Sequence, residues 1–365
     1  MKTHTLRQQV IASLIMGAVI GLLLSACATN ANTSAKQGNT PTPVPTQAVN
    51  ETMINQGNTQ LQTFQQWIAL MQQHKGDTTT YQKQYNDDQQ ALQNAQTSQA
   101  YNDSLTTLSN HINAIELPAM KAEADGLHQT LEDKVSAWQA QHTYHDDYNG
   151  QTYQYGYEYT NAGVVDYDME AMSTAQTPKA YQQIIEDFNT YLTNFQAMTD
   201  NAKDTTPYDQ THKTDTQLMQ KYNDMQGKVV IVSLYEQALR VFNKGQLVKA
   251  FQVTTGTMAH PSLPGAWWVE AKQSPTVFKS FLQPGQPGYY PPTNINYAMQ
   301  YHSDGYNMHD SWWRADYGPG TQFPHADSSG NQSAFEGSHG CVNIQEDNAH
   351  WLYDYVDLDT AVIIY

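Results

Sequence analysis

Hydrophobic positions between residues 51 and 225 recur at spacings of three and four, as they do on one face of an amphipathic helix. Two stretches show the spacing clearly, one with Leu61, Phe64, Ile68 and Met71, the other with Leu127, Leu131, Val135 and Trp138. The pattern predicts an N-terminal helical domain over residues 51–225.

The helical segment contains an internal repeat with a constant offset of 80 residues. A threonine that can cap a helix precedes each copy, Thr97 and Thr177, and Pro178 suits a first helical position. The repeat predicts a duplicated helical hairpin or bundle, because its offset is too long for a solenoid. The matched positions are Tyr101 with Tyr181, Leu105 with Ile185, Leu108 with Phe188, Ile112 with Leu192 and Ile115 with Phe195.

The pattern changes near residue 227. Runs rich in β-branched residues occupy 229–234 and 239–242, residues 243–246 suit a turn, and 247–254 suit the returning strand. Short strands then follow to a last run at 361–365. The predicted fold class is α+β multidomain, with a helical region followed by a mainly-β domain over residues 226–365.

A tyrosine-rich segment at residues 144–159 interrupts the helical pattern. Aromatic faces with polar tips could form a surface that stacks on sugars. The other interpretation is a long loop whose tyrosines pack against the protein, and the sequence leaves both open.

The composition excludes one class of partner. The chain has 365 residues, enough for two domains, and a formal net charge of −17. Binding to nucleic acid needs a surplus of Lys and Arg, so we expect no nucleic-acid partner.

The first 27 residues have the features of a targeting segment. Lys2 and Arg7 precede an apolar run at residues 10–24, which suits a signal peptide better than a membrane span. The ending Leu-Ser-Ala-Cys resembles the bacterial lipobox, which predicts that Cys27 is lipidated and anchors an exported protein to the membrane. The alternatives are an ordinary signal peptide and an uncleaved anchor. Residues 28–50, rich in Thr, Pro and Asn, read as a tether.

The cysteine count then points to Cys341. The chain has two cysteines, and a lipidated Cys27 cannot form a disulfide. Cys341 is then a lone thiol in an oxidising compartment, which favours a nucleophile over a buried structural residue. If this stretch is extended, His339 points to the same side as Cys341, and Gly340 permits a turn that exposes amide groups. His309 is the natural upstream partner.

At this point the sequence resembles a known family. Ser338-His-Gly-Cys341-Val-Asn343 is similar to the signature of bacterial L,D-transpeptidases with a YkuD-type catalytic domain. The resemblance extends over about residues 228–365. Further matching stretches are the opening strand at 228–233, Thr-Thr-Gly at 254–256, Pro-Ser-Leu-Pro-Gly at 261–265 and Met-His-Asp-Ser-Trp at 308–312.

The resemblance implies a catalytic role for three groups. Cys341 would be the nucleophile, His309 would take its proton, and the backbone carbonyl of Asp310 would orient His309. Amides around Gly340 and Cys341 would form the oxyanion hole. The implied fold is a β-sandwich-like domain with a lid, for which residues 271–300 are the best candidate.

Other residues would shape the substrate site. The resemblance implies that His339 and Asn343 position substrate and that Ser338 supports His339. Arg314 is a candidate for binding a substrate carboxylate. These assignments rest on the family pattern and not on spacing alone.

The sequence departs from the family pattern between its two motifs. His309 and Cys341 are separated by 31 residues, and the excess lies in 314–337, which we interpret as a loop insertion. The insertion contains His325, a rival candidate for the base. Asp310 is a second departure, since the family often has Ser or Gly at this position. Its carboxylate could raise the pKa of the neighbouring imidazole.

The resemblance implies a reaction. Cys341 would form a thioester with a peptidoglycan stem tetrapeptide, release D-Ala and pass the acyl group to an amine of a neighbouring stem, giving a 3→3 cross-link. This chemistry requires neither a metal nor an organic cofactor.

Three alternatives remain at this stage. An L,D-carboxypeptidase would use the same site with water as acceptor. A non-catalytic wall-binding lipoprotein would have lost the reaction, and a zinc hydrolase would use His302, His309, His325 and His339. The helical domain is expected to be a spacer, or to contact wall glycan or a protein partner.

Overall fold

The computed structural model describes residues 47–286 and 288–365. The predicted signal peptide with Cys27, and the tether up to residue 46, lie outside the described residues. Within the described part, no helix is both long and apolar enough to cross a bilayer.

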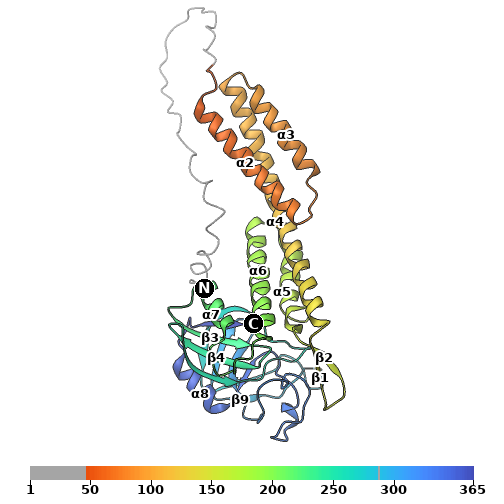
Figure 1. Ribbon diagram of the computed structural model, residues 1–365, viewed down its shortest axis with the longest axis vertical. Coiled ribbons are helices and arrows are strands. Elements are labelled where there is room, and N and C mark those ends of the chain that lie inside the picture. Colours follow the sequence, from red (N-terminus) through yellow and green to blue (C-terminus); the bar gives the residue numbers. More distant parts are fainter. Residues whose placement is uncertain (1–46, 287) are drawn as a thin grey trace, which may run out of the picture. The chain divides into compact units, whose positions relative to one another are not determined.

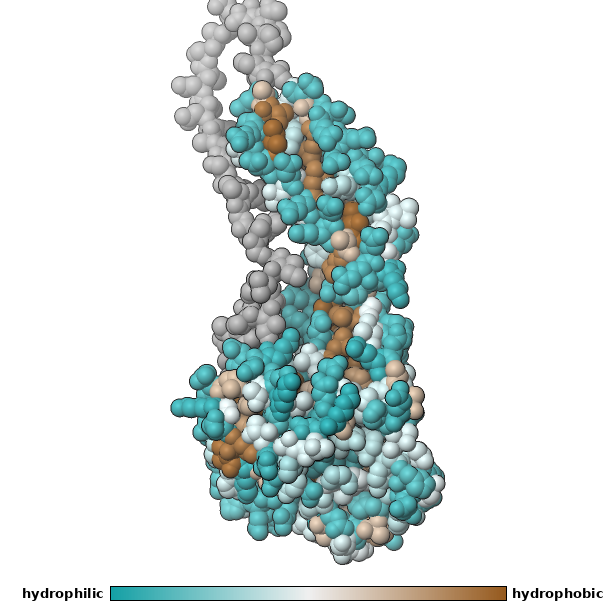
Figure 2. Space-filling view, in the orientation of Figure 1, coloured by the Kyte–Doolittle hydropathy of each residue, from teal (hydrophilic) through white to brown (hydrophobic). Residues whose placement is uncertain are grey.

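The first helices form a bundle with its own apolar core (Figure 1). Phe64, Ile68 and Met71 are buried in it, as the predicted apolar face requires. On the face shown in Figure 2 the helical region is mostly hydrophilic, with narrow apolar strips. The bundle consists of α2 (Glu51–Gln73), α3 (Thr79–Asn94) and the first half of α4 (Ser98–Gln139).

The repeat corresponds to two helix pairs. The first pair is α3 and α4, and the second is α5 (Val164–Thr174) and α6 (Pro178–Asn201). The hydroxyls of Thr97 and Thr177 accept hydrogen bonds from the amides of Ala100 and Ala180, both at 3.2 Å. Both predicted helix caps therefore form. The sequence did not predict that the long α4, 42 residues with Pro118 inside it, would carry two separate apolar runs.

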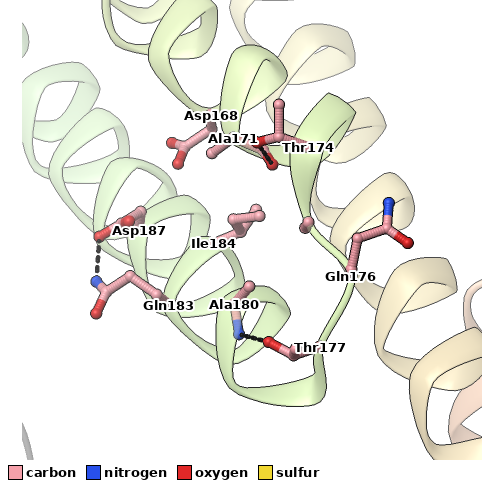
Figure 3. Close-up of a pocket in the computed structure, with 10 residues that line it drawn as sticks. Asp168, Ala171, Thr174, Gln176, Thr177, Ala180, Gln183, Ile184 and Asp187 are labelled. Atoms are coloured by element: carbon pink, nitrogen blue, oxygen red, sulfur yellow. Dashed lines mark hydrogen bonds between the residues drawn. The ribbon is translucent and has the colours of Figure 1, made fainter.

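Each helix pair contains a buried carboxylate at the same position, and the two pairs differ in the partner of that carboxylate. In the first pair, Asp88 Oδ2 lies 2.7 Å from His111 Nδ1. The same positions of the second pair hold Asp168 and Tyr191, so no cation faces the second carboxylate. Asp168 and Asp187 instead line a cavity of about 510 Å³ between α5 and α6 (Figure 3). Burial, with Asp187 nearby, raises the pKa of Asp168 to about 8, and burial raises that of Asp187 to about 7.

These raised pKa values predict a stability that falls with pH. Between about pH 4 and pH 8 the unfolded state releases protons that the folded state keeps, so folding becomes less favourable as pH rises. Asp168→Asn removes the charge but keeps an acceptor for Tyr191. We expect it to raise the free energy of unfolding by about 1–3 kcal/mol at pH 8.5 and to have little effect at pH 4. Urea denaturation at both pH values measures the difference.

Asp88→Asn is the matched control, because it removes a carboxylate that has a histidine partner. This variant is expected to destabilise the protein. An Asp168→Asn variant that is no more stable than the wild type at pH 8.5 would contradict the prediction.

The β domain contains two main sheets. The change from helix to strand falls between α7 (Lys213–Lys221) and β3 (Lys228–Ser233), around the predicted boundary. Lys244 and Gly245 both have positive φ, 50° and 74°, so the predicted turn between β4 and β5 forms a tight hairpin. The first sheet has the order β5-β4-β3-β13-β6, with β4 (Ala238–Asn243), β5 (Gln246–Gln252), β6 (Gly265–Trp268) and β13 (Ala361–Ile364).

The second sheet carries His309 and Asn343, which belong to two motifs of the family resemblance. Its order is β12-β11-β10-β7, and β11 and β12 run parallel. A short hairpin, β8 (Thr276–Phe278) with β9 (Thr293–Ile295), lies within the predicted lid segment. The remaining elements are β7 (Ala271–Gln273), β10 (Ala298–His302), β11 (Tyr306–Asp310), β12 (Val342–Ile344) and α8 (Glu346–Tyr355). The predicted fold class, helical region followed by a β-rich domain, is confirmed.

Buried hydrogen bonds join the helical region to the first sheet. Asn194 on α6 donates to the carbonyls of Gly265 and Ile364, at 3.0 and 2.8 Å. Arg240 on β4 is fully buried and donates to both carboxylate oxygens of Asp215 on α7. Residues 47–365 accordingly form one compact unit.

Candidate active site

The sheet register brings the two predicted motifs together. In the parallel pair of β11 and β12, His309 lies opposite Asn343. Cys341 precedes Asn343 by two residues, and side chains alternate along an extended strand, so Cys341 and Asn343 project to one face. The register thus places the thiol and the imidazole on neighbouring segments of the same sheet edge.

His309 is held in one orientation by the backbone. Its Nδ1 donates to the carbonyl of Asp310 at 2.8 Å, and its Nε2 lies 3.2 Å from the side-chain amide of Asn343. The expectation that the Asp310 carbonyl orients the ring agrees with this geometry. With Nδ1 as donor, the lone pair of Nε2 accepts the hydrogen bond from the Asn343 amide, so Nε2 can take a proton only when that hydrogen bond breaks.

The imidazole is neutral at physiological pH. Burial lowers the pKa of His309 to about 4, because the low-polarity surroundings disfavour the charged ring. This is opposite to the shift expected from the Asp310 carboxylate. That carboxylate accepts a hydrogen bond from the Tyr297 amide at 2.6 Å instead of contacting the imidazole.

The thiol of Cys341 is also neutral at rest. Burial raises its pKa to about 11. Its sulfur lies 3.9 Å from the carbonyl of Gly305, in the turn between β10 and β11. If a neutral imidazole is to activate this neutral thiol, the proton must move during the attack, which is general-base catalysis rather than a preformed ion pair.

The turn before Cys341 depends on a glycine. Gly340 has φ +106°, and a Cβ there would lie 2.6 Å from Tyr306 Cε1. Its amide donates to the hydroxyl of Ser338 at 3.1 Å, and that hydroxyl donates in turn to the carbonyl of Cys341. The Gly340 amide is therefore occupied, contrary to its expected place in an oxyanion hole. The Cys341 amide has no acceptor among the residues that the structure describes.

Ser338 and His339 have contacts other than those expected. Ser338 ties the backbone of the turn rather than the His339 ring. The ring of His339 stacks on His260 and also contacts Tyr290, both at 5.2 Å between centroids. Burial lowers the pKa of His339. His339 is thus part of an aromatic wall.

The β8–β9 hairpin reaches both ends of the site. Phe278 on β8 contacts His309 edge to face, at 5.0 Å between ring centroids, and Tyr290 contacts His339. Trp312 donates to the carbonyl of Asn294 at 3.0 Å, which holds β9 against the segment after His309. The expectation of a lid within residues 271–300 agrees with these contacts.

Arg314 and His325 hold the insertion together. Two nitrogens of the buried Arg314 guanidinium donate to the carbonyls of Ala334 and Glu336, at 3.1 and 2.7 Å. These two nitrogens bind the loop backbone, Nε has no hydrogen-bond partner in the described part of the chain, and a substrate carboxylate as ligand of Arg314 stays a prediction. His325 Nδ1 lies 2.8 Å from the carbonyl of Phe323, so its contacts are within the insertion and do not include Cys341.

The tyrosine-rich segment packs on the same insertion. It forms the hairpin of β1 (Thr143–His145) with β2 (Thr152–Gln154), followed by the short helix η1 (Tyr157–Tyr159) (Figure 1). Phe323 is stacked by Tyr144 and Tyr153, at 4.7 and 5.2 Å. These faces are covered by protein, which supports the interpretation as a packed loop.

Sequence reasoning missed two tyrosines near the thiol. Tyr306, at the start of β11, lies against Gly340, and Tyr167 on α5 lies 3.2 Å from it, hydroxyl to hydroxyl. Tyr306 lies three residues before His309 in the sequence, so a closer look at that motif's surroundings could have found it. Tyr167 lies in the helical region, outside the resemblance, and no local signal marks it.

No metal centre is assembled in the described residues. Over 47–286 and 288–365, no group of three or more His, Cys, Asp or Glu side chains is arranged to hold an ion. The four histidines of the zinc alternative therefore do not form a common ligand set there.

The mainly-β domain thus carries Cys341 and His309 on neighbouring segments at one sheet edge. Residues 227–364 match the family model described as the L,D-transpeptidase catalytic domain, YkuD. This part of the chain is an L,D-transpeptidase catalytic domain. No curated protein matched the sequence.

Similar solved structures include three L,D-transpeptidase chains. The enzyme from Mycobacterium smegmatis shares 21% identity over 38% of this chain and 58% of its own, with a TM-score of 0.31. The protein from Stackebrandtia nassauensis shares 21% over 48% and 66%, with a TM-score of 0.30. The catalytic domain from E. faecium shares 23% over 38% and 98%, with a TM-score of 0.30. The match thus spans 58% of the Mycobacterium smegmatis chain, and it covers a minor part of the present one.

Proposed function

We propose that this protein is a peptidoglycan L,D-transpeptidase with Cys341 as nucleophile and His309 as general base. One observation supports this most directly. The β11–β12 register brings the two residues to one sheet edge, and the Asp310 carbonyl fixes Nδ1 of His309 as the donor, which leaves the basic lone pair on Nε2, where Asn343 now donates to it.

The proposed donor is a stem tetrapeptide. The Cys341 proton moves to His309 Nε2 as the sulfur attacks the carbonyl of the third residue. The tetrahedral oxyanion is stabilised by the Cys341 amide. The C–N bond to D-Ala then breaks, and His309 returns the proton to the departing amine, leaving a thioester. An amine of a neighbouring stem attacks the thioester and gives a proton to His309, the C–S bond breaks, the sulfur takes that proton back, and the product is a 3→3 cross-link.

We also propose that the protein works outside the cytoplasm on a lipid anchor. The support is the sequence ending Leu-Ser-Ala-Cys27 after the apolar run, followed by the tether over residues 28–50. Its partners are then the membrane, through the lipid, and peptidoglycan stem peptides.

Intact-protein mass spectrometry after incubation with a tetrapeptide-containing muropeptide tests the function. We expect an acyl adduct that maps to Cys341, with release of D-Ala, and no adduct in the Cys341→Ala variant. A product formed only when an amine acceptor is added identifies a transpeptidase, and a hydrolysed product identifies the carboxypeptidase alternative. A folded protein with a reduced thiol that gains no adduct would favour a non-catalytic wall-binding role.

A further inference from the structure

The helical region reaches the catalytic site through α5. Tyr167 on α5 meets Tyr306 hydroxyl to hydroxyl at 3.2 Å, and its ring lies 6.0 Å from His302, edge to face. The ring of Tyr306 lies 5.7 Å from His302 in turn. Tyr167, Tyr306 and His302 therefore form one aromatic cluster, which we call the α5 clamp.

The α5 clamp holds the turn that encloses the thiol. This turn joins β10 to β11 and contains Gly305, whose carbonyl faces Cys341 Sγ. Its backbone is irregular, with a register shift between Gln300 and His302 and with φ +89° at Gly305. The turn has hydrogen bonds of its own, such as Gly305 N–H to the His302 carbonyl, but the bulge interrupts the strand ladder, so contacts from outside the sheet add to what fixes its position.

A second tyrosine supports the other side of the Cys341 turn. Tyr157, in η1, is buried and donates to the carbonyl of Gly256 at 2.6 Å. The Gly256 amide donates to the Ser262 hydroxyl at 3.0 Å, which donates to the Gly340 carbonyl at 2.7 Å. Three successive hydrogen bonds thus run from the helical region to the glycine before the nucleophile.

We propose that the helical region is part of the active site, with Tyr167 as a positioning residue that acts on Cys341 through Tyr306 and the β10–β11 turn. Tyr157 supports the opposite wall through Gly256 and Ser262. The inference rests on the proposed role of Cys341 as nucleophile. If the helical region were only a spacer between the membrane and peptidoglycan, it would not need to contact both sides of the Cys341 site.

Two reactions of Cys341 distinguish a positioning role of Tyr167 from a general effect of this residue on stability. Tyr167→Ala is expected to speed alkylation of Cys341 by iodoacetamide at pH 8 about threefold to tenfold, because a looser turn admits water and lowers the thiol pKa. The same variant is expected to slow acylation by the muropeptide by a similar factor, because the attack geometry is lost. Tyr167→Phe keeps the ring contacts and lacks only the hydroxyl, so it should lie between Ala and wild type in both assays.

Tyr208→Phe is the matched control. Tyr208 is exposed to a similar degree, 37% against 40% for Tyr167, and its hydroxyl has no assigned partner in the described part of the chain. It should leave both rates and the alkylation pH profile unchanged.

The inference is supported if Tyr167→Ala speeds alkylation of Cys341 and slows its acylation while the midpoint of thermal unfolding stays unchanged. Unchanged rates in Tyr167→Ala overturn it, as does a parallel fall of both rates together with the midpoint. If the wild type forms no acyl adduct, the proposed function fails, and the alkylation profile still decides whether Tyr167 positions Cys341.

Discussion

Replacing His309 with alanine is expected to slow acylation of Cys341 about a hundredfold to ten-thousandfold at neutral pH. The thiol has a pKa of about 11, so almost none of it is thiolate at neutral pH. The neutral imidazole, with a pKa of about 4, takes the proton during the attack. Without it, the reaction depends on the small thiolate fraction.

The pH dependence gives the sharper test. In the wild type, both reacting groups are in the required form between about pH 5 and pH 9, so the acylation rate should change little there. In His309→Ala the rate should rise about tenfold per pH unit, because it follows the thiolate fraction up to the thiol pKa. Burst-phase acylation by the muropeptide, followed by mass spectrometry, measures both profiles.

His145→Ala is a suitable control, since His145 is a largely exposed histidine on β1. It should retain both the rate and the flat profile. A His309→Ala variant with the same flat profile as the wild type would show that another group accepts the proton, and His325 would be the next to test.

The largest effect on stability is expected from Asp215→Ala, which should lower the free energy of unfolding by about 3–5 kcal/mol. Asp215 on α7 and Arg240 on β4 are both fully buried. Two hydrogen bonds, of 2.8 and 3.1 Å, join them, and Tyr365 also donates to the carboxylate at 3.2 Å. Removal of the carboxylate leaves a buried guanidinium with one remaining carboxylate partner, Glu236. Urea denaturation at pH 7 measures the loss.

Asp87→Ala is the matched comparison. Asp87 pairs with Lys83 on α3, but the two side chains are 59% and 78% exposed. An exposed pair is worth about 0–1 kcal/mol, so this variant should differ little from the wild type. Equal losses in the two variants would contradict the importance assigned to the buried pair.

The Arg240–Asp215 pair and Tyr167 both indicate that the helical region is firmly joined to the β domain. Arg240, Asn194 and Tyr157 join it to the β domain through buried polar groups, which are costly to leave unpaired. Domains of one chain can move relative to each other unless their interface is large and hydrophobic, and residues of α4, α6 and α7 share one apolar core with the first sheet. The helical region is instead packed as a continuation of the catalytic domain.

The sequence alone determined the type of most elements and the candidate reacting residues. Periodicity of three and four placed α2, α4 and α6, because a buried helix face repeats at that spacing. Thr97 and Thr177 marked two helix starts, because a cap is a local interaction. Cys341 and His309 could be named because they lie in short local motifs, and the Asp310 carbonyl adjoins His309 in the chain.

Only the tertiary structure decided the electrostatics and the partners of the site. The pKa of His309 falls and that of Cys341 rises because of burial, which depends on segments far away in the sequence. Arg314 bonds to carbonyls 20 and 22 residues further on, so its role could not be read from its position beside the motif. Tyr167 and Tyr306 are 139 residues apart, and their contact follows from how α5 packs, for which no local pattern exists.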